Sequence, residues 1–68
     1  MERALSEREE EVTKWAARGL SNLEIGEKLG IEIGTVKLHL HHIFVKLGLR
    51  NRTELTLYAL GKRMRPRR

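Results

Sequence analysis

Lys37, Leu38 and His41 bring three different chemistries to one side of a predicted helix. An ammonium and an imidazole donate hydrogen bonds, whereas a branched apolar side chain packs against methyl groups. These side chains project from residues 33–47, a segment that contains no carboxylate. The combination is unusual for a solvated helix surface, and it favours contact with a partner rich in hydrogen-bond acceptors and apolar groups.

The other side of the same segment is apolar. Val36, Leu40, Ile43 and Leu47 fall within about 60° of arc at the helical rotation of about 100° per residue. Such a stripe predicts burial against other helices. The side that carries Lys37 must then face outward.

The major groove of DNA offers what this outward side can bind, because guanine presents two acceptors there and thymine presents a methyl group. We therefore expect Lys37, Leu38 and His41 to contact bases. Side chains and free N–H groups in the first turns of two helices, and one histidine beside the outward side, are expected to hold DNA phosphates. These residues are Ser21, Asn22, Gly34, Thr35 and His42. A single exposed leucine is ordinary on protein surfaces, so Leu38 alone does not decide the question.

Local sequence chemistry predicts the helices that position these residues. Three oxygen-bearing side chains are each followed three residues later by glutamate, which is the spacing of a capping box. The pairs are Ser6 with Glu9, Ser21 with Glu24, and Asn51 with Glu54. Glycines that suit a left-handed helix end follow the first three apolar runs at positions 19, 30 and 48. The predicted helices span about residues 7–18, 22–29, 33–47 and 52–61, and no strand is expected.

The apolar faces of the first two helices can meet the third in one core. Those faces comprise Leu5, Val12, Trp15, Ala16, Leu20, Ile25, Leu29 and Ile31. Gly30 and Ile31 leave only a tight turn before the third helix, as a helix-turn-helix requires. The expected fold is all-α, a four-helix helix-turn-helix domain over residues 1–61, and the basic residues 62–68 are expected to form a disordered tail.

The last predicted helix has two apolar sides. Leu55, Tyr58 and Ala59 form one, while Leu57 and Leu60 form the other, which Met64 continues if the helix extends. A short terminal helix cannot bury both, so the second side predicts a homodimer through residues 52–61 or packing on another domain. A dimer suits DNA, because two recognition helices about 34 Å apart can read a palindrome. A hydrophobic edge without a partner is the remaining interpretation.

Charge is distributed unevenly along the 68 residues. Residues 1–34 hold five Lys/Arg and eight Glu, a net charge of −3, whereas residues 35–68 hold nine Lys/Arg and one Glu, a net charge of +8. This asymmetry favours a polyanionic partner, although a merely solvated charged surface is an alternative. The chain has no cysteine, no apolar run long enough to span a bilayer and no signal peptide, so we expect a cytoplasmic protein.

Three histidines lie close together in the sequence at positions 39, 41 and 42. His39 and His42 share a helix side, but His41 points elsewhere and no Cys, Asp or Glu lies nearby on the helix, so no metal site is expected. His39 is expected at the edge of the core. His41 and His42 are expected to face phosphate or bases.

Together these stretches resemble the LuxR/GerE/FixJ-type DNA-binding domain of bacterial transcription regulators, a winged-helix-like fold without a wing. The resemblance is carried by residues 5–9 (LSERE), 19–25 (GLSNLEI), 29–31 (LGI), 35–39 (TVKLH) and 46–54 (KLGLRNRTE). It implies that residues 33–47 form the recognition helix, that Lys37, Leu38 and His41 contact bases, and that the fourth helix mediates dimerisation. It also implies backbone contacts by Asn22, Thr35, Lys46 and Arg50, to which we add Arg52.

Two positions depart from the family's pattern. Glu7 stands where the family often has proline, and Glu32 stands where it commonly has serine before the third helix. A Glu cap followed by Gly34 in the first turn predicts a weak start to that helix, by about 1 kcal/mol. His41 occupies a position that is basic or polar in many relatives, so the preferred bases cannot be transferred from them.

The sequence thus predicts a sequence-specific double-stranded DNA-binding transcription regulator, or the DNA-binding domain of one, without cofactor, metal, small-molecule ligand or membrane partner. RNA polymerase is a candidate further partner. A promoter-reading module like the last region of a sigma factor, and a basic protein-interaction module, remain alternatives. Catalysis is not expected, because the chain offers no nucleophile with an oriented base and no metal set.

Overall fold

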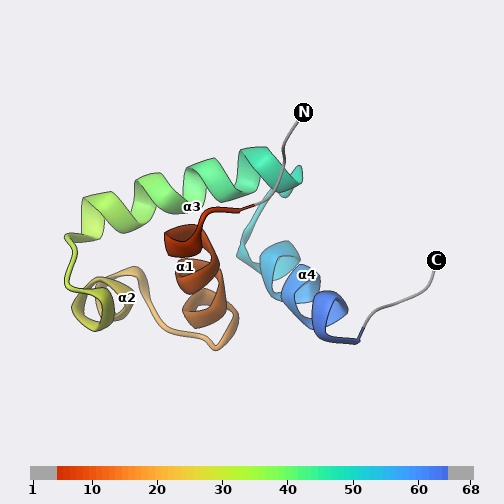
Figure 1. Cartoon of the computed structure of the whole chain (residues 1–68), viewed down its shortest axis with the longest axis horizontal. Helices are drawn as coiled ribbons and strands as arrows, with labels where there is room; N and C mark the ends of the chain where they lie inside the picture. Colours follow the sequence, from red (N-terminus) through yellow and green to blue (C-terminus); the bar gives the residue numbers. More distant parts are fainter. Residues whose placement is uncertain (1–4, 65–68) are drawn as a thin grey trace.

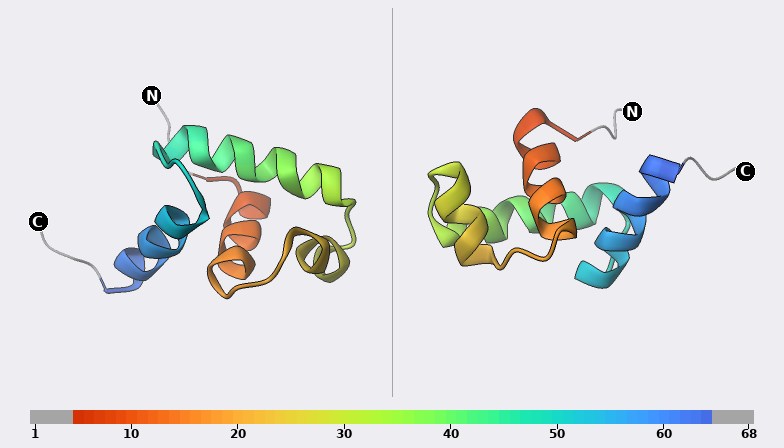
Figure 2. Two further views of the ribbon diagram at one scale, coloured as in Figure 1. Left: turned by 180° about the vertical axis from the view of Figure 1, so that it is seen from behind. Right: turned by 90° about the horizontal axis from the view of Figure 1, so that it is seen from below.

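The computed structural model describes residues 5–64, which form four helices and no strand. These are α1 (Glu7–Ala17), α2 (Asn22–Leu29), α3 (Ile33–Leu47) and α4 (Arg52–Met64). Helix α1 lies between α2 and α4, and α3 runs across one side of this row (Figures 1 and 2). The all-α fold expected from the sequence is confirmed. Helix α4 continues beyond the expected end at residue 61 into the segment assigned to the tail, of which residues 65–68 lie outside the described residues.

Two complete capping boxes begin α1 and α2. The Ser6 side chain accepts from the Glu9 N–H at 3.1 Å, and the Glu9 carboxylate accepts from the Ser6 N–H at 2.9 Å. Ser21 and Glu24 repeat this exchange at 3.1 and 2.8 Å. Each box satisfies two backbone N–H groups that would otherwise lack partners, so both helices start where the sequence predicts.

The other two helix starts are less regular. Asn51 accepts from the Glu54 N–H at 2.9 Å, but the Glu54 carboxylate accepts from the N–H of Arg50 rather than from that of Asn51, at 2.8 Å. Glu32 at the start of α3 makes no side-chain capping bond, as its sequence predicted. The third capping box is therefore only half formed, and α3 begins without one.

The core lies where the inner sides of the four helices meet. Its buried apolar residues are Val12, Ala16, Ile25, Val36, Leu40, Ile43 and Leu55. Half-buried residues packed against them include Leu47, Trp15 and Leu20. The predicted stripe on α3 is thus confirmed as the inner side, with Leu47 at its edge.

Gly26, in the interior of α2, determines how closely the helix-turn-helix connection folds back. A Cβ at this buried position would lie 2.6 Å from the carbonyl oxygen of Ile31 in the turn. The Ile31 N–H donates to the Gly26 carbonyl at 2.9 Å, so the turn rests directly on the α2 backbone. Gly30 completes the turn in the left-handed conformation, with φ of 73°, as the sequence predicted. The sequence does not predict this role of Gly26, since a glycine inside a helix gives no local signal of a close approach.

None of the helices in the described part of the chain combines the length and the apolar character needed to cross a membrane.

Candidate nucleic-acid interface

The outward side of α3 is open to solvent. Lys37, Leu38 and His41 are all exposed, with Leu38 at 53%. Val45 extends the same side and is 65% exposed. The ribbon views show that α3 has one side turned away from the other three helices (Figures 1 and 2). The structure therefore brings the three predicted base-contacting residues together on one accessible surface, which we call the recognition face.

An open hollow of about 400 Å³ adjoins the recognition face. Its lining comes from three helices and consists of Asn22, Lys37, Leu40, His41, Phe44 and Arg52. Donor groups of α2, α3 and α4 thus converge on one place, beside two apolar side chains that form part of its wall. The chain separation of these residues explains why no sequence window could reveal the hollow.

Most of the predicted backbone-contacting residues are accessible. Asn22 is half-buried, and the others are exposed: Ser21, Gly34, Thr35, His42 and Arg50. Ser21 and Asn22 begin α2, and Gly34 and Thr35 lie in the first turn of α3. Helix N-termini carry N–H groups and a partial positive charge, so both positions suit a phosphate. The Arg50 guanidinium also pairs with the Glu54 carboxylate at 3.5 Å.

Lys46, predicted to contact the backbone, is engaged inside the domain. Its ammonium lies 2.7 Å from the carboxylate of Glu9, whose side chain is only 8% exposed. The hydrogen bond from Lys46 lowers the pKa of Glu9 below its ordinary value of 4.5, against the opposing effect of burial and with help from the Ser6 backbone N–H. Glu9 therefore caps α1 and also ties α1 to the last turn of α3. The capping motif predicted the first role, but no local pattern predicted the second.

Arg52 also binds within the domain. Its guanidinium donates to the side-chain oxygen of Asn22 at 2.7 Å and to the carbonyl of Leu20 at 2.6 Å. Both acceptors belong to the start of α2. The expected DNA contact of Arg52 stays a prediction, and two of its donors bind the start of α2 in this structure.

The histidines do not form a metal-binding group. His41 and His42 are exposed with ring centroids 6.0 Å apart, and His39 is half-buried. Within residues 5–64, no three His, Cys, Asp or Glu side chains are grouped so as to hold a metal ion. The arrangement leaves both exposed imidazoles available to a partner beside α3.

Cations of the N-terminal half gather around one aromatic ring. The charged groups of Lys14, Arg18 and Lys28 lie 4.6, 5.3 and 4.6 Å from the ring centroid of Trp15. Such contacts attract a cation to the ring face. The contact of Lys28 with Trp15 joins α2 to α1.

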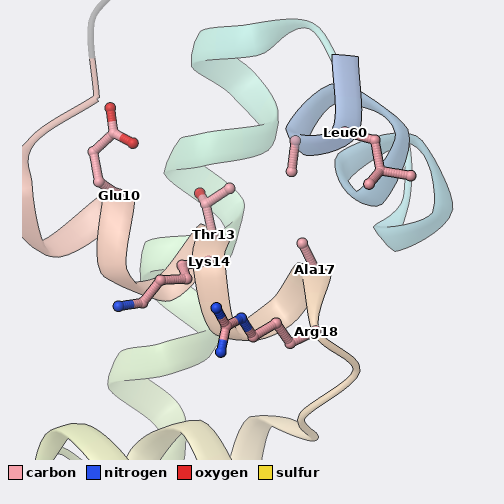
Figure 3. A pocket seen from close by; sticks show the side chains of 7 residues that line it. Glu10, Thr13, Lys14, Ala17, Arg18 and Leu60 are labelled. Atoms are coloured by element: carbon pink, nitrogen blue, oxygen red, sulfur yellow. The ribbon is translucent and has the colours of Figure 1, made fainter. Parts of the chain in front are cut away.

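A second open groove, of about 480 Å³, runs between α1 and α4 (Figure 3). Thr13 and Lys14 line it from α1, Arg18 lines it directly after the end of α1, and Ala59 and Leu60 line it from α4. The hydroxyl of buried Thr13 has no hydrogen-bond partner within the described residues. The groove shares no lining residue with the hollow at the recognition face.

The sides of α4 differ as the sequence predicted. Leu55 is fully buried, and Tyr58 and Ala59 are half-buried. Leu57 and Leu60, on the second side, are 61% and 49% exposed. The side chain of Met64 lies outside the described residues.

A tight turn between α2 and α3, and an uncovered α3 that presents donors and apolar groups, define a helix-turn-helix domain of the DNA-binding class. The sequence pattern of the GerE family, "Bacterial regulatory proteins, luxR family", matches residues 3–59. The chain belongs to this luxR family, as its motifs indicated.

Known relatives extend well beyond this domain. The chain is 47% identical over 60 residues to the "Oxygen regulatory protein NreC" of Staphylococcus aureus strains JH9, JH1 and Mu3. The match covers 88% of this chain and 28% of each relative. The chain therefore corresponds to a little more than a quarter of the length of these regulators.

Proposed function

We propose that this domain recognises a specific double-stranded DNA sequence by inserting α3 into the major groove, as part of a transcription regulator. Lys37 donates to guanine, Leu38 packs on a thymine methyl, and His41 donates to a base acceptor or a phosphate. The observation that carries the proposal is the joint exposure of these three side chains on one side of α3.

Backbone contacts complete the proposed complex. The N–H groups and hydroxyls at the starts of α2 and α3 bind phosphates, together with Arg50 and His42. Lys46 lies farther along α3 and stays a proposed contact, in addition to its bond to Glu9. The excess positive charge of residues 35–68 favours the same orientation towards a polyanion.

Selection from a randomised duplex library with the purified chain tests this proposal. We expect enrichment of a short half-site, and binding that weakens with salt at a slope of about −0.9 per phosphate contact. Lys37→Ala should relax the preference at one base pair, whereas Lys14→Ala, in the groove between α1 and α4, should leave every preference unchanged. The proposal is wrong if no sequence is enriched and association with duplex does not depend on salt.

We further propose that two copies associate through α4. The exposed Leu57 and Leu60 support this arrangement, since a stripe of exposed leucines on a short helix gains stability by pairing with its own copy. Leu57→Asp should leave the helical content unchanged and convert a dimer to a monomer in sedimentation equilibrium. A monomer at high concentration for the unsubstituted chain, free and on a palindromic duplex, would contradict this.

The competing functions make different predictions. A sigma-like promoter module or a protein-interaction module needs RNA polymerase or an acidic protein for its activity, whereas a regulator's domain binds duplex by itself. We propose that the domain binds nucleoid DNA and catalyses no reaction. RNA polymerase is proposed as a partner of the whole regulator.

A further inference from the structure

Arg52 joins the start of α4 to the start of α2 across about thirty residues of chain. Its two guanidinium nitrogens donate to Asn22 Oδ1 at 2.7 Å and to the carbonyl of Leu20 at 2.6 Å. The planar guanidinium fixes both acceptors at once. Because Leu20 precedes α2 and Asn22 is its first residue, Arg52 restrains the segment on which Ser21 caps the helix.

The chemistry of the pair also fixes how the Asn22 amide is turned. A guanidinium carries only donors, so Asn22 must present its oxygen to Arg52. The amide NH₂ is consequently directed away from the guanidinium, and it has no hydrogen-bond partner within the described residues. Asn22 lines the hollow that Lys37 and His41 also line, so a free donor stands beside the recognition face.

We propose that Arg52 is a positioning residue for DNA binding that acts through Asn22. It holds the amide so that the NH₂ group donates to a DNA backbone oxygen, and it sets the position of the α2 start relative to α3. This inference rests on the proposed function, and it replaces a direct phosphate contact by Arg52 with an indirect role.

The two roles differ in their salt dependence. A direct contact between Arg52 and a phosphate releases counterions, so its loss reduces the salt slope by about 0.9. Asn22 is neutral, so the loss of its donor or of its orientation weakens binding at every salt concentration and leaves the slope unchanged. A defect that merely reduced the folded fraction would disappear once affinities were corrected for the folded population.

A double-mutant cycle on the selected duplex tests the inference. Asn22→Ala and Arg52→Met should each weaken binding about tenfold, the effect of one hydrogen bond to a charged group. The double variant should lose about tenfold in total rather than a hundredfold, because both changes remove the same contact. Folded fractions are measured by circular dichroism at the temperature of the binding assay.

Arg50→Met is the matched control, because Arg50 is a neighbouring arginine whose side chain is 85% exposed and is proposed to contact phosphate directly. Its effect should add to that of Asn22→Ala and should reduce the salt slope. If Arg52→Met does not fold, Arg52→Lys keeps the charge but not the planar fork, and it should still lose most of the affinity that Asn22 contributes.

The outcomes separate this inference from the proposed function. Additive losses for Arg52 and Asn22, a reduced salt slope for Arg52→Met, or full affinity in Arg52→Lys would overturn the positioning role while leaving DNA binding established. Failure of the unsubstituted chain to bind duplex would overturn both.

Discussion

The inner and outer sides of α3 use neighbouring residues for opposite purposes. Val36 and Ile43 are fully buried, whereas Lys37 and Leu38 are exposed, although they directly follow Val36 in the chain. The inner side is constrained by the shape of the domain's own core, and the outer side by the chemistry of a partner. Substitutions on the two sides should therefore separate stability from binding.

The largest expected effect is on the inner side. Ile43→Ala removes a fully buried side chain from the junction of the helices, and we expect a loss of about 2–5 kcal/mol in the free energy of unfolding. The free energy of unfolding of a 68-residue chain is small, so a large fraction of the variant should be unfolded. Urea denaturation followed by circular dichroism measures this.

Val45→Ala is the control on the outer side of the same helix, where the side chain is 65% exposed. Its free energy of unfolding should change by no more than about 0.5 kcal/mol. Equal losses for the two variants would remove the distinction between the sides.

Two glycines sharpen the comparison. Gly26→Ala places a methyl group 2.6 Å from the backbone oxygen of Ile31, so we expect a loss of about 1–3 kcal/mol in stability. At Gly34, by contrast, an added Cβ would meet open space. Apart from the backbone of its own helix and its chain neighbours, no atom of the described residues would lie within 4 Å of it. Gly34→Ala should therefore stabilise the domain by up to about 1 kcal/mol. If DNA approaches closely at Gly34, the same substitution should weaken binding.

Thermal unfolding and duplex titration of both variants measure these effects. A more stable Gly34→Ala variant with weaker binding is the expected pattern. A Gly26→Ala variant as stable as the unsubstituted chain would show that the turn does not rest on α2 as described.

The smallest expected effect concerns the bond between Glu9 and Lys46. Because the pKa of Glu9 is lowered below 4.5, its contribution to stability is complete above that pH and is lost as the pH falls through the lower folded-state value. Glu9→Gln keeps the capping oxygen but removes the charge. This variant should be less stable by about 1 kcal/mol at pH 7, and the difference should shrink as the pH falls below 4.5.

Urea denaturation at several pH values compares the two proteins. Parallel stability curves, with a constant difference down to the lowest pH, would contradict the assignment of this acid sensitivity to Glu9.

Local chemistry predicted most of the fold. Ser6 and Ser21 with their glutamates fixed two helix starts, and the apolar period of α3 identified its buried side, because these signals depend on residues three or four positions apart. The same period also placed Lys37, Leu38 and His41 on the exposed side.

What the sequence could not predict depends on contacts between distant segments. Three contacts are of this kind. Lys46 bonds to Glu9 and Arg52 donates a hydrogen bond to Asn22, and each of these joins two helices. The close approach at Gly26 joins a helix and a turn. Lys46 and Arg52 were expected to reach DNA because they are basic and lie in a matching motif, and neither motif nor charge indicates an internal partner.

Base discrimination by Leu38→Ala tests the central claim most directly, namely that the outer side of α3 reads base pairs. Affinities for the selected duplex and for its single base-pair variants should show that Leu38→Ala loses about 1–3 kcal/mol of discrimination at one position and keeps the other preferences and its stability. An equal loss on every sequence, or no loss at all, would contradict the account.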